Sequence, residues 1–146
     1  MIFDDFEQRP LLRTGGMTEK DYLNSTREVL SRRGKVDYAF LFGSVLKQLR
    51  PDSDIDILIG GRLNFGEKTD LAMDLAIRLK RDVDIVLASE ASCELALNVF
   101  SRGKSILIKS QKALKKDYFK IYRLYEQTSG LRDLRLARIK REFGNG

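Results

Sequence analysis

Residues 41–59 read LFGSVLKQLRPDSDIDILI, and this stretch predicts both a sheet and the position of a charged site on it. Side chains alternate between the two faces of a strand, so Asp54 and Asp56 share one face. The opposite face carries three isoleucines, Ile55, Ile57 and Ile59. At a rise of about 3.3 Å per residue, the two aspartate Cα atoms lie about 7 Å apart. Two like charges at this spacing destabilise the fold unless something neutralises them, and shared divalent metal ions would do so.

The pair Gly43–Ser44 comes just before the two aspartates and follows an apolar strand candidate. Gly43 has no Cβ, so a phosphate can approach its backbone, and Ser44 adds a hydroxyl donor. A short helix predicted at about 45–49, stopped before Pro51, would direct free amides and its positive dipole end at the same anion. A Gly-Ser turn alone is common, and its meaning here comes from the strand before it and the aspartates after it.

A third carboxylate, Asp84, lies within the apolar run 83–87. A charge in the middle of a buried strand costs several kcal/mol unless it is paired, hydrogen-bonded or bound to metal. If this strand neighbours 55–59, three carboxylates converge and could hold one or two Mg²⁺ ions. The alternatives are an exposed sheet edge or a salt bridge to an arginine. Asp82 has the same facing and competes for the role, but it follows two basic residues at the strand's expected solvent end.

The composition narrows the possible chemistry. The chain has no histidine, which removes Ser-His and Cys-His mechanisms, and its single cysteine, Cys93, argues against a zinc site and an internal disulfide. Catalysis would then rest on oxygen ligands and hard metals. With 42% apolar and 33% charged residues, no apolar run long enough to cross a membrane and an acidic N-terminus, the sequence predicts a cytoplasmic protein without a membrane partner.

The net charge of +6 is unevenly distributed along the chain. Residues 1–100 hold 14 Lys and Arg against 17 Asp and Glu, whereas residues 101–146 hold 13 against 4. The basic C-terminal third could contact nucleic acid, the phosphates of a nucleotide or an acidic protein surface. A solvated helix face without a ligand is the alternative.

Periodicity and capping residues predict helices and strands in alternation. A helix begins at Thr18, with Asp21 three residues later, and ends near Gly34, whose left-handed conformation would terminate it. A second follows Asn64, and a third begins at Ser89 and ends near Gly103. Strands are predicted at 36–42, at 55–59 with Gly60-Gly61 ending it, at 82–88 and at 105–109.

Ser110 is expected to cap a long helical segment over 111–142, with a kink or a two-helix hairpin at Gly130. The element order predicts an α/β (α+β) fold, with a mixed sheet of about four to five strands flanked by helices and a C-terminal helical tail. With 146 residues, the chain is expected to form one domain, with its core at about 18–110 and its helical extension at 111–142.

Together these motifs resemble the minimal nucleotidyltransferases of the DNA polymerase beta-like superfamily, over about residues 20–110. Gly43, Ser44, Asp54 and Asp56 match the family's Gly-Ser and Asp-x-Asp motif, and Asp84 matches its third metal ligand. The resemblance implies a polymerase beta-like fold, Mg²⁺ held by the three aspartates, with two ions expected, and transfer of a nucleoside monophosphate from an NTP with release of pyrophosphate.

The chain departs from that pattern in two places. Nine residues separate Ser44 from Asp54 where many relatives have ten, and Val45 stands where an arginine often follows the Gly-Ser pair. Both departures affect the expected binding of the triphosphate and leave the expected metal site unchanged.

Within the superfamily, the small size and helical tail are similar to the antitoxins that pair with HEPN-domain toxins. That resemblance implies transfer of AMP from ATP to a tyrosine of a HEPN toxin, with Asp54 and Asp56 binding both metals. Asp84 would bind the catalytic metal and help deprotonate the acceptor hydroxyl. One alternative is a non-catalytic antitoxin that acts by contact through its basic, aromatic tail. Another is an enzyme that modifies nucleic-acid ends. The sequence leaves open the NTP, the acceptor and whether the protein forms a homo- or hetero-oligomer.

Overall fold

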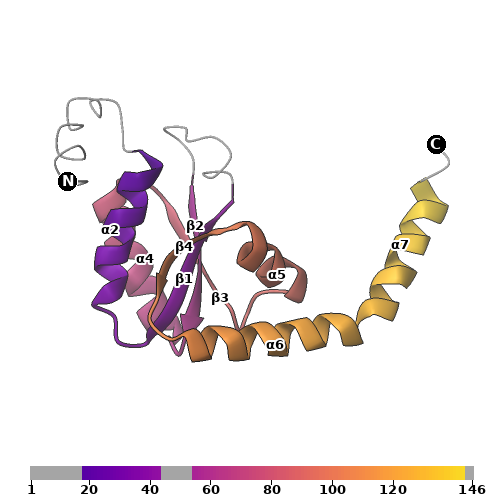
Figure 1. The fold of residues 1–146 in the computed structure, drawn as a ribbon. Coiled ribbons are helices and arrows are strands. Elements are labelled where there is room, and N and C mark those ends of the chain that lie inside the picture. The colour runs from indigo at the N-terminus through magenta and orange to yellow at the C-terminus, as the bar shows by residue number, and fades with distance from the viewer. Residues whose placement is uncertain (1–17, 44–53, 144–146) are drawn as a thin grey trace.

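The structure, a computed structural model, describes residues 18–43 and 54–143 (Figure 1). Its elements run α2 (Glu19–Ser31), β1 (Val36–Phe42), β2 (Ile55–Gly61), α4 (Phe65–Leu79), β3 (Val83–Leu87), α5 (Cys93–Arg102), β4 (Lys104–Ile108), α6 (Gln111–Gln127) and α7 (Ser129–Phe143). None of the helices in these ranges is long and apolar enough to cross a membrane.

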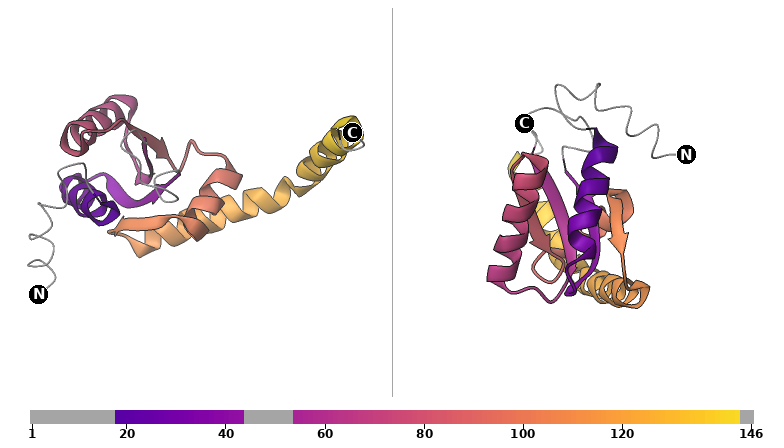
Figure 2. Two further views of the ribbon diagram at one scale, coloured as in Figure 1. Left: turned by 90° about the horizontal axis from the view of Figure 1, so that it is seen from above. Right: turned by 90° about the vertical axis from the view of Figure 1, so that its left-hand side faces the viewer.

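Four described strands form one mixed sheet in the order β3-β2-β1-β4. The central strand β1 pairs antiparallel with both β2 and β4, and β2 pairs parallel with β3. Helices α2 and α4 cover one face, while α5 and α6 lie against the other (Figures 1 and 2). The mixed, helix-flanked sheet predicted from the sequence is therefore confirmed.

The core between the sheet and helices α2 and α4 is formed by the apolar faces that the sequence predicts. Leu71, Leu75 and Leu79 of α4 are all buried there. They pack with the three isoleucines of β2, each with no exposed surface: Ile55, Ile57 and Ile59. Alternation along β2 thus places its isoleucines toward α2 and α4 and Asp56 on the other face.

Two capping boxes fix where these covering helices begin. The Thr18 hydroxyl accepts from the Asp21 N–H, and the Thr18 N–H donates to the Asp21 carboxylate. At the start of α4, Asn64 and Glu67 make the same reciprocal pair. The Asn64 backbone N–H, with Lys35, holds the pKa of the Glu67 carboxyl below its usual range. Both starts agree with the sequence prediction.

The opposite face of the sheet is aromatic. Tyr38 and Phe40 of β1 are buried there with Leu58 of β2 and Val99 of α5. The Tyr38 and Phe40 rings each meet Phe100 edge-on, with centroids 5.9 and 5.6 Å away. This second core holds α5 and the first part of α6 against the sheet.

Strand β2 is longer than the sequence predicts. Gly60 and Gly61 do not end it but continue the pairing, with Gly60 opposite Tyr38 and Gly61 opposite Val36. A Cβ built on Gly60 would overlap the Tyr38 ring. The glycine therefore makes room for an aromatic side chain on the neighbouring strand, which a strand's own sequence does not reveal.

Other expected boundaries also shift. Helix α5 begins at Cys93 with Ser92 as its N-cap, because residues 88–90 form a turn first. Helix α2 ends at Ser31, and Gly34 lacks the left-handed conformation expected of it, since the positive-φ glycines in the described residues are Gly43 and Gly61.

The long C-terminal segment bends once and does not fold back as a hairpin (Figure 1). The break is at Thr128, two residues before the expected Gly130, which lies in the first turn of α7. The short helix predicted at about 45–49 lies outside the described residues.

Replacing Gly60 with alanine should destabilise the protein by about 1–3 kcal/mol, because the added methyl forces the Tyr38 ring out of its packed position. Gly34→Ala is the matched control, since a Cβ there meets nothing within 4 Å. Urea denaturation of both variants measures the difference. Equal midpoints for Gly60→Ala and wild type would contradict the packing role.

Candidate active site

The candidate site lies where three strand ends meet, at the end of β1 and the beginnings of β2 and β3. Phe42 pairs with Asp56 across the β1–β2 ladder, and Asp56 pairs with Asp84 across the β2–β3 ladder. The strand neighbours expected from the sequence are confirmed, since Asp56 and Asp84 are direct register partners. Asp54, just before β2, has an exposed side chain.

The surroundings of Asp56 perturb its carboxyl group. Its side chain is half-buried, and burial raises its pKa above the usual range, with further increases from the charges of Asp84 and Asp54. Burial is the larger cause of this raised pKa, and the charges of Asp84 and Asp54 add to it. A cation bound here would remove the repulsion between these charges.

Gly43 is held against this carboxylate. Its φ of +89° is in the left-handed region, and a Cβ built on it would overlap Asp56 Oδ2. The sequence suggests Gly43 as an opening for a phosphate; the structure shows that the residue also leaves room for the Asp56 side chain. Ser44, the other predicted phosphate contact, lies outside the described residues.

Asp84 is exposed, contrary to the expectation of a charge inside a buried strand. Strand β3 is an edge of the sheet, so the apolar run 83–87 buries one face while Asp84 faces solvent. The free-energy cost of removing a carboxylate from water, which the sequence predicts for Asp84, therefore falls on the half-buried Asp56 instead. Within the described part of the chain, Asp84 forms no salt bridge, and its register partner is another carboxylate.

Asp82 is less closely connected with the other carboxylates than Asp84. It precedes β3, its side chain is exposed, and its backbone carbonyl accepts from the Ile55 N–H at 2.9 Å. Asp84, in contrast, is the direct register partner of Asp56. The geometry therefore favours Asp84 as the third member.

The carboxylates suit a hard cation that keeps other ligands. Among the described residues, no three acidic or cysteine side chains lie close enough together to hold a metal ion as they stand. An open set of carboxylate oxygens on one sheet face is typical of Mg²⁺ sites, where water and substrate phosphates complete the shell. The donor chemistry, a set of carboxylates, is therefore of the kind that Mg²⁺ takes.

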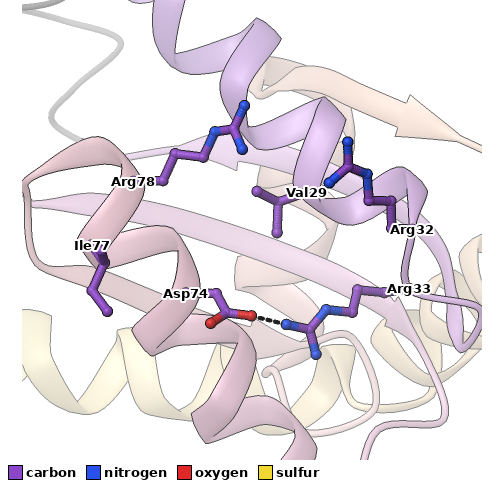
Figure 3. Close-up of a pocket in the computed structure, with 6 residues that line it drawn as sticks. All are labelled: Val29, Arg32, Arg33, Asp74, Ile77 and Arg78. Carbon is purple, nitrogen blue, oxygen red and sulfur yellow. Dashed lines mark hydrogen bonds and ion pairs between the residues drawn. The ribbon is translucent and has the colours of Figure 1, made fainter.

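A separate cavity lies between α2 and α4, on the other side of the sheet (Figure 3). It has a volume of about 280 Å³ and is lined partly by Arg33, Asp74 and Arg78. Arg33 pairs with Asp74, and Arg78 pairs with Glu28 at 2.6 Å. These ion pairs join α4 to α2 and to the turn that follows α2, so the arginines of this cavity have structural partners and lie apart from the aspartates of the candidate site.

Two features near the second core are not evident from motif analysis. The Tyr38 hydroxyl donates to Asp117 of α6 at 2.8 Å. An apolar cavity of about 410 Å³ also opens between α5 and α6. The sequence signals were the lone aspartate among the lysines of α6 and the aromatic cluster of Tyr118, Phe119 and Tyr122, which mark a face without fixing its neighbours.

Fold and motifs together define a nucleotidyltransferase domain. The family model described as Polymerase beta, Nucleotidyltransferase matches residues 24–112, more than half of the chain, and the chain belongs to this family. A search of curated proteins finds no significant match.

Solved structures narrow the likeness to antitoxins of HEPN–MNT toxin–antitoxin systems. One is a toxin–antitoxin structure with AMP-PNP, at 28% identity and a TM-score of 0.68, covering 80% of this chain and 97% of that one. Another is a tri-AMPylated Shewanella oneidensis HEPN toxin in complex with MNT antitoxin, at 26% identity and a TM-score of 0.65, covering 81% of this chain and 95% of that one. A third is an MntA–HpeT variant in which two aspartates, two positions apart, are changed to glutamate. It has 27% identity and a TM-score of 0.68, and the match covers 80% of this chain and 97% of that one.

Asp56→Asn should raise the melting temperature in EDTA by a few degrees, because it removes the charge that Asp84 and Asp54 repel. Mg²⁺ should stabilise the wild type more than this variant. Asp82→Asn is the control and should melt like wild type in EDTA. Scanning calorimetry measures all three proteins. A lower melting temperature for Asp56→Asn in EDTA would contradict the repulsion.

Gly43→Ala should lower stability by about 1–3 kcal/mol, because the new methyl meets Asp56 and the backbone is strained at positive φ. Adding Asp56→Ala should recover part of the loss, since it removes the carboxylate and leaves the backbone strain. A double-mutant cycle measured by urea denaturation separates the two contributions. Strictly additive effects would show that the two residues do not compete for the same space.

Proposed function

We propose that this chain is a Mg²⁺-dependent nucleotidyltransferase that transfers AMP from ATP to a tyrosine hydroxyl of a HEPN-domain partner. The observation that carries the proposal is the placement of Asp56 directly opposite Asp84, with Gly43 against the Asp56 carboxylate. The choice of ATP, the tyrosine and the HEPN partner draws support from relatives described with AMP-PNP and with a tri-AMPylated HEPN toxin.

In this proposal Asp54, Asp56 and Asp84 hold the metal ions. When bound, Mg²⁺ would neutralise charge that develops on the transferring phosphoryl group. Asp56 is half-buried and fixed by the sheet, so it would set the position of the site, whereas Asp54 and Asp84 are exposed and can reach outward. Gly43 and Ser44 would contact the triphosphate.

The transfer forms one bond and breaks one. The acceptor oxygen bonds to the α-phosphorus of ATP while the bond from that phosphorus to the bridging oxygen breaks, and pyrophosphate leaves with the electron pair. Asp84 would take the proton of the acceptor hydroxyl. Its exposure on an edge strand suits this role, because a second protein can approach it without entering the core.

Transfer is tested by incubating the protein with ATP, Mg²⁺ and the HEPN protein encoded beside it, followed by intact-mass measurement of the partner. Wild type should add one or more AMP units. Asp54→Asn and Asp84→Asn should each slow transfer by about 100-fold or more, because phosphoryl transfer depends on the charge that these groups hold in place. Asp82→Asn is the matched control and should keep nearly the full rate.

Transfer at the wild-type rate by Asp84→Asn, with loss in Asp82→Asn, would move the third ligand to Asp82. A rate unchanged in Asp54→Asn would overturn the metal site. Running CTP, GTP and UTP in parallel tests the choice of ATP.

A second candidate function is neutralisation of the partner by contact alone, which the exposed helices α6 and α7 favour. Inhibition of the partner without a mass change would support it. The basic tail also keeps nucleic-acid end modification as an alternative, and AMP appearing on RNA in the same assay would favour that reading.

A further inference from the structure

The two C-terminal helices form an arm that leaves the body of the protein (Figures 1 and 2). We define this C-terminal arm as residues 111–143, made of α6 and α7. Helix α6 packs on α5, β1 and β2, whereas α7, among the described elements, has a substantial contact only with α6. At 1.5 Å per residue, α7 extends about 22 Å beyond the bend.

The direction of the arm is fixed by specific contacts. At its base, the Tyr38 hydroxyl donates to Asp117, and burial together with this bond raises the pKa of Tyr38 well above its usual range. At the bend, the Arg132 guanidinium lies 3.3 Å from the centroid of the Tyr125 ring. Its Nη1 also donates to the Tyr125 carbonyl at 2.5 Å and to Thr128 Oγ1 at 2.9 Å.

Helix α7 exposes apolar side chains that nothing in the described part of the chain covers. Leu136, Ile139 and Phe143 recur three and four residues apart and so lie along one side, with Phe143 73% exposed. Leu131 and Leu134, three residues apart, are 64% and 69% exposed. A helix of about 15 residues is marginal in water without packing. Its apolar residues therefore indicate a surface that becomes buried on binding.

Where the arm meets the body of the protein, its apolar surface borders a cavity. The 410 Å³ opening between α5 and α6 is lined by Phe40, Phe100, Leu114, Lys115, Tyr118 and Phe119. Tyr118 stacks on Tyr122 at 6.2 Å, which extends the aromatic surface along α6. Phe40, which lines the cavity, is two residues before Phe42, the register partner of Asp56, so the cavity lies on the sheet face that carries Asp56.

Charge decides which occupant suits this surface. The arm carries ten Lys and Arg against four Asp and Glu, a net charge of +6. If a second copy docked through the same arm, two surfaces that each carry a net charge of +6 would face each other, and their repulsion disfavours self-association. Nucleic acid would satisfy the charge but leave the leucines of α7 exposed. A protein with apolar side chains in an acidic surface satisfies both features.

We propose that the C-terminal arm is the docking surface for an acidic protein partner, with an apolar partner side chain seated in the cavity between α5 and α6. The inference rests on the proposed function in taking this partner to be the HEPN protein that receives the nucleotide. Docking on the face that carries Asp56 brings the partner to the same side of the sheet as the reacting groups. The arm then gives the enzyme its acceptor specificity, while the aspartates perform the transfer.

Binding of the purified HEPN protein encoded beside this chain, measured by calorimetry, tests the docking surface. The double variant Leu136→Glu/Ile139→Glu and the cavity variant Phe119→Asp should each weaken binding at least about tenfold, because each places a charge in an apolar contact. Ile77→Glu is the matched control. This residue of α4 is 74% exposed and lines the cavity between α2 and α4 on the other side of the sheet, and its replacement should leave affinity unchanged.

Charge is tested with Arg135→Gln/Arg138→Gln. This variant should bind less tightly at 50 mM salt and show a weaker dependence on salt than wild type. Circular dichroism and melting curves of every variant should match wild type, because the changed side chains are exposed. An arm variant that binds the HEPN protein as tightly as wild type while keeping its fold would overturn the docking surface. A wild-type dimer dispersed by the arm substitutions, or binding of RNA in place of the protein, would also overturn it.

The proposed function and the proposed docking surface can be refuted independently of each other. Asp56→Asn should bind the HEPN protein like wild type and fail to transfer AMP. Leu136→Glu/Ile139→Glu should bind ATP and Mg²⁺ like wild type and lose transfer in proportion to its loss of affinity. Full transfer by Asp56→Asn would refute the proposed function alone, and full binding by the arm variant would refute the docking surface alone.

Discussion

The pairing register between the parallel strands β2 and β3, which sets Asp56 opposite Asp84, is the constraint on which the site depends. This register is enforced from the other face of the sheet, where Ile55, Ile57 and Ile59 are buried against α2 and α4. A slip of one residue would place the isoleucines in the site and the aspartates in the core. Burial of apolar surface, the largest favourable contribution to folding, therefore holds two like charges together.

The cost of that arrangement falls unevenly on the carboxylates. Asp56 is half-buried, repelled by two neighbours and in contact with the backbone of Gly43, whereas Asp54 and Asp84 remain in solvent. Sites of this kind store electrostatic repulsion that a bound cation relieves, which couples ligand binding to stability. The glycine at the end of β1 is part of the same arrangement, because only a residue without a side chain leaves space for the carboxylate.

The two faces of the sheet differ in how completely helices cover them. On the α2–α4 face, leucines and isoleucines are fully buried, and ion pairs such as Arg78–Glu28 and Lys35–Glu67 join or brace the covering elements. The α5–α6 face is only partly covered: it carries Asp56 at one end, an aromatic cavity and the arm beyond. Separating a closed, stabilising face from an open, binding face allows the site to be charged and accessible without weakening the main core.

The sequence by itself determined the features that depend on neighbours along the chain. The facing of Asp56, the capping boxes at Thr18 and Asn64 and the four strands all follow from alternation, spacing and local hydrogen bonds. The polymerase beta-like resemblance was carried by the Gly-Ser and Asp-x-Asp motifs. Only the tertiary structure decided that β3 is an edge strand, which exposes Asp84 and moves the cost of burial to Asp56. It also decided that Gly60 makes room for Tyr38, that Gly43 makes room for Asp56, and that the arm bends at Thr128, with Arg132 stacked on Tyr125. Each glycine contact joins residues more than ten positions apart, and the bend depends on how one helix packs on the next. Local pattern does not specify which side chains meet across strands and helices.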